Sequence, residues 1–255
     1  MTISLAAEPA IAYLLASLRI VAWLVVVPPF SNRGIPVTAK IVLAIGLSFA
    51  VAPSVIESGV PTATVGLILT ALTQVAVGLA LGFVTSLLLG TIAAAGAMID
   101  VFGGFALAAA FDPLSMNMNT VFGKFHSMLA TMLLFASGGH LLVIGGLLKT
   151  FTILPLGESP DLSGAPEVML TAFGVFMVTA VQIALPMIAV LFIADLGLAL
   201  LTKVSPQMNA MNVMFPAKIG LVLLLLGLSF PALPEVSARL VELVNEAAVA
   251  LLGGG

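Results

Sequence analysis

Charged residues are scarce in this sequence, and cysteine is absent. Lys and Arg number 8 and Asp and Glu 11 among 255 residues, so 7% of the chain is charged, whereas a soluble domain carries roughly 25%. So few charges cannot cover a surface that faces water, and most of the protein must therefore face lipid or other apolar protein. The lack of cysteine excludes disulfides, thiol catalysis and cysteine metal sites.

The remaining polar residues exclude further classes of protein. A net charge of −3 provides no basic surface for nucleic acid. The two histidines, His126 and His140, have no carboxylate cluster beside them, so neither a metal site nor a cofactor is predicted. No phosphate loop, no paired carboxylates and no Ser-His-Asp order with a supporting context is present. The sequence therefore predicts a protein that is not an enzyme.

Long apolar runs predict membrane-spanning helices, because backbone exposed to lipid must satisfy its own hydrogen bonds. The runs are rich in Leu, Ala and Val and lack the ten-residue alternation of a membrane barrel. Block 101–111 is too short to cross a bilayer, so six spans are predicted. We expect an all-α polytopic membrane protein of helical hairpins, with one membrane-integral domain over 1–255. The apolar blocks are 10–30, 41–56, 65–99, 101–111, 127–154, 168–202 and 219–233.

The basic residues predict an orientation for these spans. The even-numbered loops and the tails contain only two basic residues, Lys149 and Arg239. Positive residues favour the cytoplasmic side of a membrane, so both termini are predicted on the opposite, periplasmic side. The basic residues of the odd-numbered loops are Arg33, Lys40, Lys124, Lys203 and Lys218.

Two apolar blocks, 65–99 and 168–202, are longer than a bilayer crossing needs. As helices of about 35 residues they would each reach roughly 52 Å, against a hydrocarbon core of about 30 Å. Three interpretations stay open: the blocks are tilted, kinked helices, or they fold back, or they continue beyond the bilayer against other apolar protein. Pro186 offers a break in the second block. Gly78 and Gly82 form a small-xxx-small pair that allows close helix approach in the first.

Three polar residues stand out inside apolar sequence: Arg19, His140 and Asp195. Ionisable residues within membrane segments are costly and are often functional, for example in proton relays. The alternative is a structural role, with Asp195 near a helix end and paired with Lys203 or another chain. We interpret all three as structural residues.

The stretch Val101–Thr120 follows Asp100 and opens with two glycines. Its short apolar run suits a re-entrant or pore-blocking loop, which is tolerated only inside protein or a cavity. An interfacial connector is the alternative. The candidate plug residues are Gly103, Gly104, Phe105, Leu107, Phe111, Asp112, Pro113, Met116 and Met118.

The polar interruption Lys203–Lys218 predicts a cytoplasmic docking surface. It contains three methionines, two asparagines and a glutamine but no acid. Methionines provide adaptable apolar contact, and amides can satisfy a partner's backbone. A passive hairpin tip is the alternative. The candidate docking residues are Lys203, Pro206, Gln207, Asn209, Met211 and Lys218.

Four motifs, in order along nearly the whole chain, resemble the FliR family of flagellar export-gate proteins. They are PPFSNRGIP at 28–36, AAFDP at 109–113, the stretch 139–157 that begins GHLL and ends LPLG, and DLGLALLTKVSPQMNAMNVMFPAKIGL at 195–221.

This resemblance implies a subunit of the type III secretion export gate in the bacterial inner membrane, at the flagellar basal body. It implies FliP-like and FliQ-like partners around a narrow channel for unfolded proteins. Residues 1–165 would be a FliP-like part, and 166–255 a FliQ-like hairpin. Gly103–Met118 would help to plug the closed channel, and an FlhB-like protein would bind near Lys203–Lys218. The alternative is a proton- or solute-coupled secondary transporter that uses Asp195 and His140.

Overall fold

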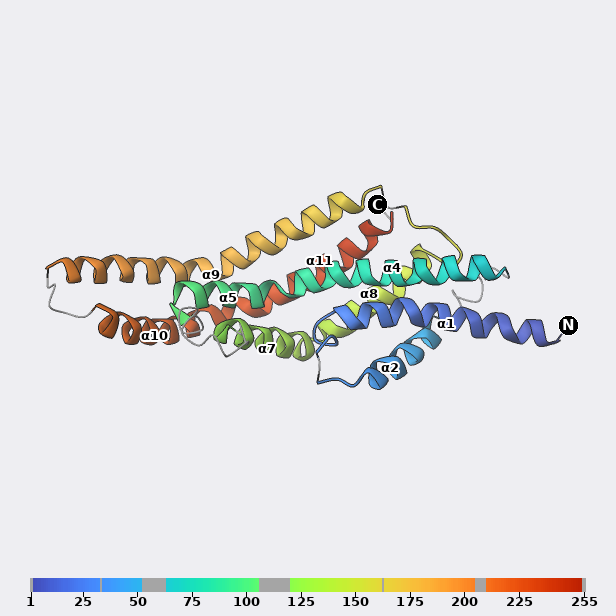
Figure 1. The fold of residues 1–255 in the computed structure, drawn as a ribbon, viewed down its shortest axis with the longest axis horizontal. Coiled ribbons are helices and arrows are strands. Elements are labelled where there is room, and N and C mark those ends of the chain that lie inside the picture. The colour runs from blue at the N-terminus through green and yellow to red at the C-terminus, as the bar shows by residue number, and fades with distance from the viewer. Residues whose placement is uncertain are drawn as a thin grey trace. The chain divides into compact units, whose positions relative to one another are not determined.

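The computed structural model describes residues 2–32, 34–51, 63–105, 120–161, 163–204 and 210–253. Within these ranges the protein is helical and contains no strand (Figure 1). The predicted all-α class is therefore confirmed. The elements are α1 (Thr2–Val26), α2 (Val37–Ala50), α4 (Thr64–Leu89), α5 (Thr91–Phe102), α7 (Val121–Ala136), α8 (Gly139–Ile153), α9 (Ala165–Val204), α10 (Ala210–Ser229), the short 3-10 helix η1 (Phe230–Ala232) and α11 (Leu233–Leu251).

Proline and glycine mark most of the helix boundaries. Helix α1 ends shortly before Pro28, and α2 begins directly after Pro36, because the residue before a proline avoids the helical region. Gly90 separates α4 from α5, so the apolar block 65–99 is interrupted and is not one helix. Gly138, with φ +72°, separates α7 from α8 in a conformation that favours glycine.

The second long apolar block lies within a single helix. Helix α9 has 40 residues and continues through Pro186, and α10 likewise continues through Pro216. A 40-residue helix is about 60 Å long, roughly twice the hydrocarbon thickness of a bilayer. The fold-back interpretation of block 168–202 is therefore wrong.

Four helical segments are long and apolar enough to cross a membrane among the residues that the structure describes. They are Glu8–Val26, Thr64–Leu89, Ala165–Val204 and Pro216–Leu251. The bent pair α7 and α8 makes five if it counts as one span. Among the described residues the predicted six spans are therefore not all found, because α2, in the block expected over 41–56, has only 14 residues, about 21 Å of helix.

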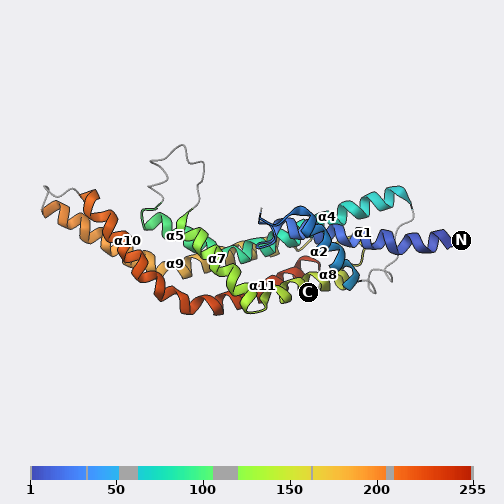
Figure 2. The ribbon, with the colours of Figure 1, turned by 90° about the horizontal axis from the view of Figure 1, so that it is seen from below.

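The chain divides into two compact units, and the first comprises Met1–Leu89, Phe135–Gly174 and Arg239–Gly255. In this unit α1 packs against both α2 and α4 (Figure 2). The approach of α4 is close, because a Cβ built on Gly78 would meet the carbonyl oxygen of Arg19 and lie 2.9 Å from the Cβ of Ala22. One built on Gly82 would lie 3.2 Å from the Cβ of Val26. The small-xxx-small pair thus lies at a helix contact.

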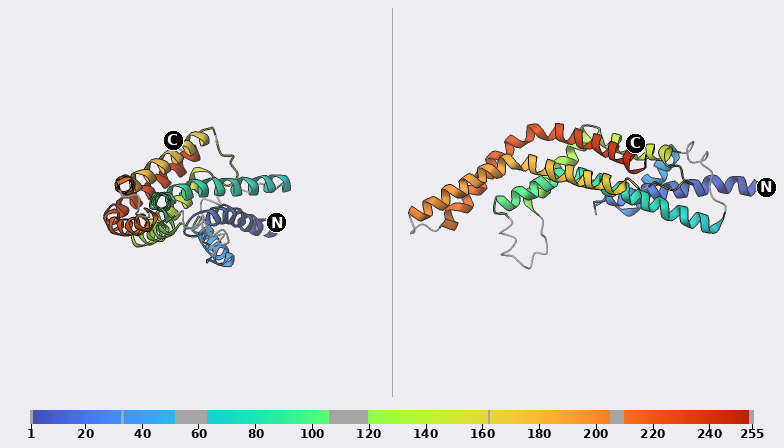
Figure 3. Two further views of the ribbon diagram at one scale, coloured as in Figure 1. Left: turned by 60° about the vertical axis from the view of Figure 1, so that its left-hand side comes forward. Right: turned by 90° about the horizontal axis from the view of Figure 1, so that it is seen from above.

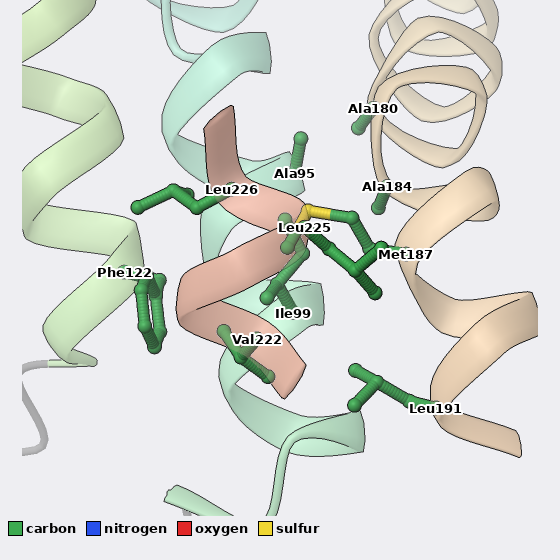
Figure 4. Close-up of a cluster of buried hydrophobic side chains, with 10 residues drawn as sticks. All are labelled: Ala95, Ile99, Phe122, Ala180, Ala184, Met187, Leu191, Val222, Leu225 and Leu226. Atoms are coloured by element: carbon green, nitrogen blue, oxygen red, sulfur yellow. The ribbon is translucent and has the colours of Figure 1, made fainter. Parts of the chain in front are cut away.

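The second unit comprises Gly90–Leu134 and Val175–Ala238. Helix α10 runs beside the C-terminal half of α9 as a hairpin (Figures 1 and 3). The core of this unit is a cluster of buried apolar side chains from four helices (Figure 4). Its members are Ala95 and Ile99 of α5, Phe122 of α7, Ala180, Ala184, Met187 and Leu191 of α9, and Val222, Leu225 and Leu226 of α10.

Large apolar side chains also cover much of the outer surface. Leu170 is 73% exposed, Val204 82% and Leu224 71%. Soluble monomers seldom expose large contiguous apolar surfaces, whereas lipid or neighbouring subunits would cover such side chains. The apolar surface and the long helices together define a polytopic membrane protein.

Candidate functional site

The predicted plug segment begins and ends within the second unit. Gly103, Gly104 and Phe105 are described by the structure. The other six candidate plug residues, Leu107, Phe111, Asp112, Pro113, Met116 and Met118, lie outside the described residues. We call the described residues at its two ends, 100–105 and 120–123, the neck.

The leading side of the neck is a turn at the end of α5. The Gly103 amide donates a hydrogen bond to the Ile99 carbonyl oxygen at 2.7 Å, and the Gly104 amide donates to Val101 at 3.3 Å. Gly104 has φ +83°, a left-handed conformation that only glycine adopts without strain. The two glycines identified in the sequence therefore end α5 and redirect the chain.

The trailing side of the neck is held by a buried carboxylate. Oδ2 of Asp100, in α5, accepts a hydrogen bond of 2.9 Å from the amide of Gly123, in the first turn of α7. Amides in the first turn of a helix have no intrahelical acceptor and favour negative charge. Asp100 has no exposed surface. The Asp100 carboxylate therefore joins the end of α5 to the beginning of α7.

Aromatic packing adds a second contact across the neck. The rings of Phe105 and Phe122 meet edge to face, with centroids 5.0 Å apart, a favourable arrangement for aromatic pairs. Beneath them, Nδ1 of the fully buried His126 lies 2.9 Å from the Phe122 carbonyl oxygen. The described part of the chain provides no hydrogen-bond partner for His126 Nε2 or for Asp100 Oδ1.

Lys218 connects the neck to the hairpin of α9 and α10. Its Nζ lies 2.7 Å from Oδ1 of Asp195 on α9 and donates a hydrogen bond of 3.3 Å to the carbonyl oxygen of Phe102, the last residue of α5. The expected pairing of Asp195 with Lys203 is wrong, because α10 brings Lys218 alongside Asp195 while Lys203 lies exposed in the last turn of α9.

The predicted docking loop is shorter than expected. Helix α10 already begins at Ala210, so Met211 is helical, and its side chain is outside the described residues. Lys218, expected at the end of the loop, is instead 7% exposed within α10. Pro206, Gln207 and Asn209 lie outside the described residues.

The first unit contains a separate polar cluster around Arg19, which has no exposed surface. Its Nε donates to Oε1 of Gln74 at 2.7 Å, and Nη1 donates to the carbonyl oxygen of Thr150 at 3.1 Å. Nη2 donates to the carbonyl oxygen of Leu154 at 2.9 Å, and the guanidinium lies 4.2 Å from the centre of the Phe151 ring. Arg19 thus joins α1 to α4 and to the end of α8.

His140 lies apart from this cluster. Its ring is tilted against that of Phe135, with centroids 4.6 Å apart. Within the described residues no group of three or more His, Cys, Asp and Glu side chains could hold a metal ion.

The role of Asp100 at the neck was missed in the sequence, although one signal was present. Asp100 is the first charged residue after the run from Ser58 to Ile99, and the two glycines follow it closely. An acid at the end of an uncharged run and next to a turn is a candidate cap for a following helix.

The fold and the apolar surface define the class, an all-α membrane protein. Residues 10–244 match the sequence model of the bacterial export proteins, family 1. The chain belongs to this family, which confirms the FliR resemblance.

Relatives in several bacteria support this membership. The chain is 32% identical to the flagellar biosynthetic protein FliR of Escherichia coli over 192 residues, covering 75% of this chain and 74% of that protein. It is also 32% identical to FliR of Aquifex aeolicus over 222 residues, covering 87% and 86%. The surface presentation of antigens protein SpaR of Salmonella typhimurium is 29% identical over 219 residues, covering 83% and 81%.

Proposed function

We propose that this chain is a subunit of the flagellar or type III export apparatus in the bacterial inner membrane, and that it forms part of the channel through which unfolded proteins leave the cell. The observation that carries the proposal is the family match over residues 10–244. The apolar outer surface supports it, because a helix such as α9 is about twice as long as a bilayer is thick and needs apolar protein beside it.

The neck supports a plug role for Gly103–Met118. A segment that blocks a channel needs a fixed base. The described residues on either side of 106–119 make such contacts, because Gly103 and Gly104 form a hydrogen-bonded turn and the Gly123 amide donates to the buried Asp100. The proposed partners are FliP-like and FliQ-like subunits, with 1–165 as the FliP-like part and 166–255 as the FliQ-like hairpin. The chain binds no cofactor and performs no catalysis in this proposal.

Purification from the native bacterium tests the proposal. A tagged chain, extracted in mild detergent, should co-purify with FliP-like and FliQ-like subunits, and deletion of its gene should abolish secretion of flagellar or effector proteins. A secondary transporter would instead purify as a self-sufficient unit and leave secretion intact. Assembly without such partners would contradict the proposal.

The orientation and the docking loop need a second experiment. We propose that both termini are periplasmic and that 203–218 faces the cytoplasm and an FlhB-like protein. Because the chain has no cysteine, single cysteines at Gln207 and Met211 can be labelled with an impermeant thiol reagent. Labelling is expected only from the cytoplasmic face and should fall when the FlhB-like protein is present. Labelling from the periplasm would contradict the orientation.

A further inference from the structure

We propose that Asp100 and His126 together form a buried proton-binding site between α5 and α7. The ligand is a single proton, which the two side chains hold as a pair. Neither residue has exposed surface, and both belong to the second unit. This inference goes beyond the proposed function, because it concerns what the isolated chain binds and needs no assembled export apparatus.

Two contacts between α5 and α7 bring these side chains to the same place. Oδ2 of Asp100 accepts a hydrogen bond from the Gly123 amide at 2.9 Å. One turn earlier on α5, a Cβ built on Gly96 would lie 2.8 Å from Nδ1 of His126, so the imidazole occupies space that only a glycine leaves. The two helices run in opposite directions at these contacts, and the Asp100 carboxylate acts electrostatically on His126.

The hydrogen bonds of the pair leave two acceptors without a donor. Nδ1 of His126 lies 2.9 Å from the Phe122 carbonyl oxygen. A carbonyl oxygen only accepts, so Nδ1 carries the hydrogen and Nε2 of the neutral ring holds a lone pair. Within the described residues, neither Nε2 nor Oδ1 of Asp100 has a hydrogen-bond partner. Buried acceptors without donors are costly, and one added proton turns one of the two acceptors into a donor.

The charge of the site favours a proton over an uncharged donor such as water. A carboxylate beside a neutral imidazole leaves one negative charge next to the core side chains of Ile99 and Phe122 (Figure 4), and an unpaired buried charge is costly. Burial also opposes an imidazolium, whereas the Phe122 carbonyl and Asp100 favour it. A proton on His126 makes the pair neutral overall and keeps the carboxylate that caps α7. A water molecule would satisfy the two acceptors but leave the charge.

The other charged residues near this site are already paired or face outward. Lys218 on α10 forms an ion pair with Asp195, with Nζ and Oδ1 2.7 Å apart. Lys124 on α7 and Glu235 on α11 are exposed. None of the ion pairs among the described residues includes Asp100. His126 is thus the group placed to offset the buried carboxylate.

Nuclear magnetic resonance of the two histidine rings tests the proposal in the full chain, purified in detergent with isotope-labelled histidine. The ring nitrogen signals show which nitrogen holds the hydrogen and whether a second proton is bound. We expect the neutral His126 ring to carry its hydrogen on Nδ1 and to take up one proton as the pH is lowered. Asp100→Asn should reduce the proton affinity of His126 about tenfold or more, because a nearby opposite charge favours the protonated ring by at least that factor.

His140 is the internal control, because it lies in the first unit, and it should titrate identically in both proteins. Asp100→Ser keeps an oxygen that can cap α7 without the charge, and it replaces Asp100→Asn if that variant does not fold.

Two results would overturn the proposal. A His126 ring that stays neutral at every pH at which the wild-type protein is folded would show that the site binds no proton and that an uncharged donor such as water serves the two acceptors. Equal proton affinity of His126 in the wild type and in the folded Asp100 variant would show that Asp100 has no part in the site.

Discussion

Replacement of Gly78 by alanine should destabilise the contact between α1 and α4. The added Cβ would meet the carbonyl oxygen of Arg19 and would lie 2.9 Å from the Cβ of Ala22. The carbonyl belongs to the backbone of a helix and cannot rotate away, so α1 itself must shift. Because the side chain of the same Arg19 makes the buried hydrogen bonds to α4 and α8, a shift of α1 would disturb those bonds as well.

Two opposing terms set the expected change in the free energy of unfolding for Gly78→Ala. Overpacking of a tight contact costs about 1–3 kcal/mol, while the change from glycine to alanine in a helix returns about 0.5–1 kcal/mol. At Gly82 the built Cβ would lie 3.2 Å from Val26 Cβ, a milder contact. At Gly46, on α2, it would meet nothing within 4 Å. The predicted order of stability is therefore Gly46→Ala highest, then Gly82→Ala, then Gly78→Ala.

This order can be measured by thermal unfolding of the detergent-purified protein, with the loss of the monodisperse peak as the signal. Gly78→Ala should lower the midpoint clearly below that of the wild type, and Gly46→Ala should leave it unchanged or raise it slightly. Equal midpoints for these two variants would refute the close approach of α1 and α4 at Gly78.

Four further substitutions are expected to have specific effects. Arg19→Lys should lower the same midpoint, because a lysine lacks the planar fork and leaves at least one buried acceptor unpaired, at about 1–3 kcal/mol. Asp100→Asn should weaken the charged cap on α7 by about 1 kcal/mol and increase proteolysis within the plug segment. Gly104→Val should increase closed-gate conductance, because φ +83° strains a β-branched residue. Gly145→Ala, with nothing within 4 Å of its built Cβ, should leave the unfolding midpoint unchanged or raise it, whereas Gly146→Ala should give a lower midpoint than Gly145→Ala, because an asparagine side chain of α11 must rotate away from the new Cβ.

Each of these four has an outcome that contradicts it. An unchanged unfolding midpoint for Arg19→Lys would mean that the planar guanidinium of Arg19 is not needed. Unchanged proteolysis for Asp100→Asn would show that the Asp100 carboxylate does not stabilise the neck. Wild-type conductance in the Gly104→Val variant would contradict the claim that the turn at Gly104 is needed to keep the gate closed. Equal effects at Gly145 and Gly146 would contradict the packing of α8 against α11.

The class of the fold follows from composition, because scarce charge leaves lipid and apolar protein as the only surroundings for most of the surface. Helix ends also followed local chemistry, as at Pro36 and at the break of the block 65–99 at Gly90. The predicted number of spans was not reached among the described residues, because it depended on the length of α2, and hydropathy alone does not show where a short helix ends.

The contacts of the site could not be predicted in the same way. Asp195 and Lys218 belong to different helices, and their pairing depends on where α10 begins and on which of its faces meets α9. Because the sequence predicted a loop over 203–218, Lys203 was the basic residue nearer to Asp195 along the chain and was the expected partner. The cap by Asp100 likewise requires two helix ends to meet in space, which the spacing of residues along the chain does not reveal.

The most direct test of the central claim is whether an exported protein touches the neck during transport. A photo-crosslinking amino acid placed at Phe105, in cells that hold a stalled, partly exported substrate, should crosslink to that substrate. The same amino acid at Leu170 of α9, a residue that is 73% exposed, is the control and should not crosslink to the substrate. Crosslinking at Phe105 that depends on the stalled substrate is the predicted result. Assembled complexes that show no substrate crosslink at Phe105, or equal crosslinking at both positions, would contradict a channel role for the neck.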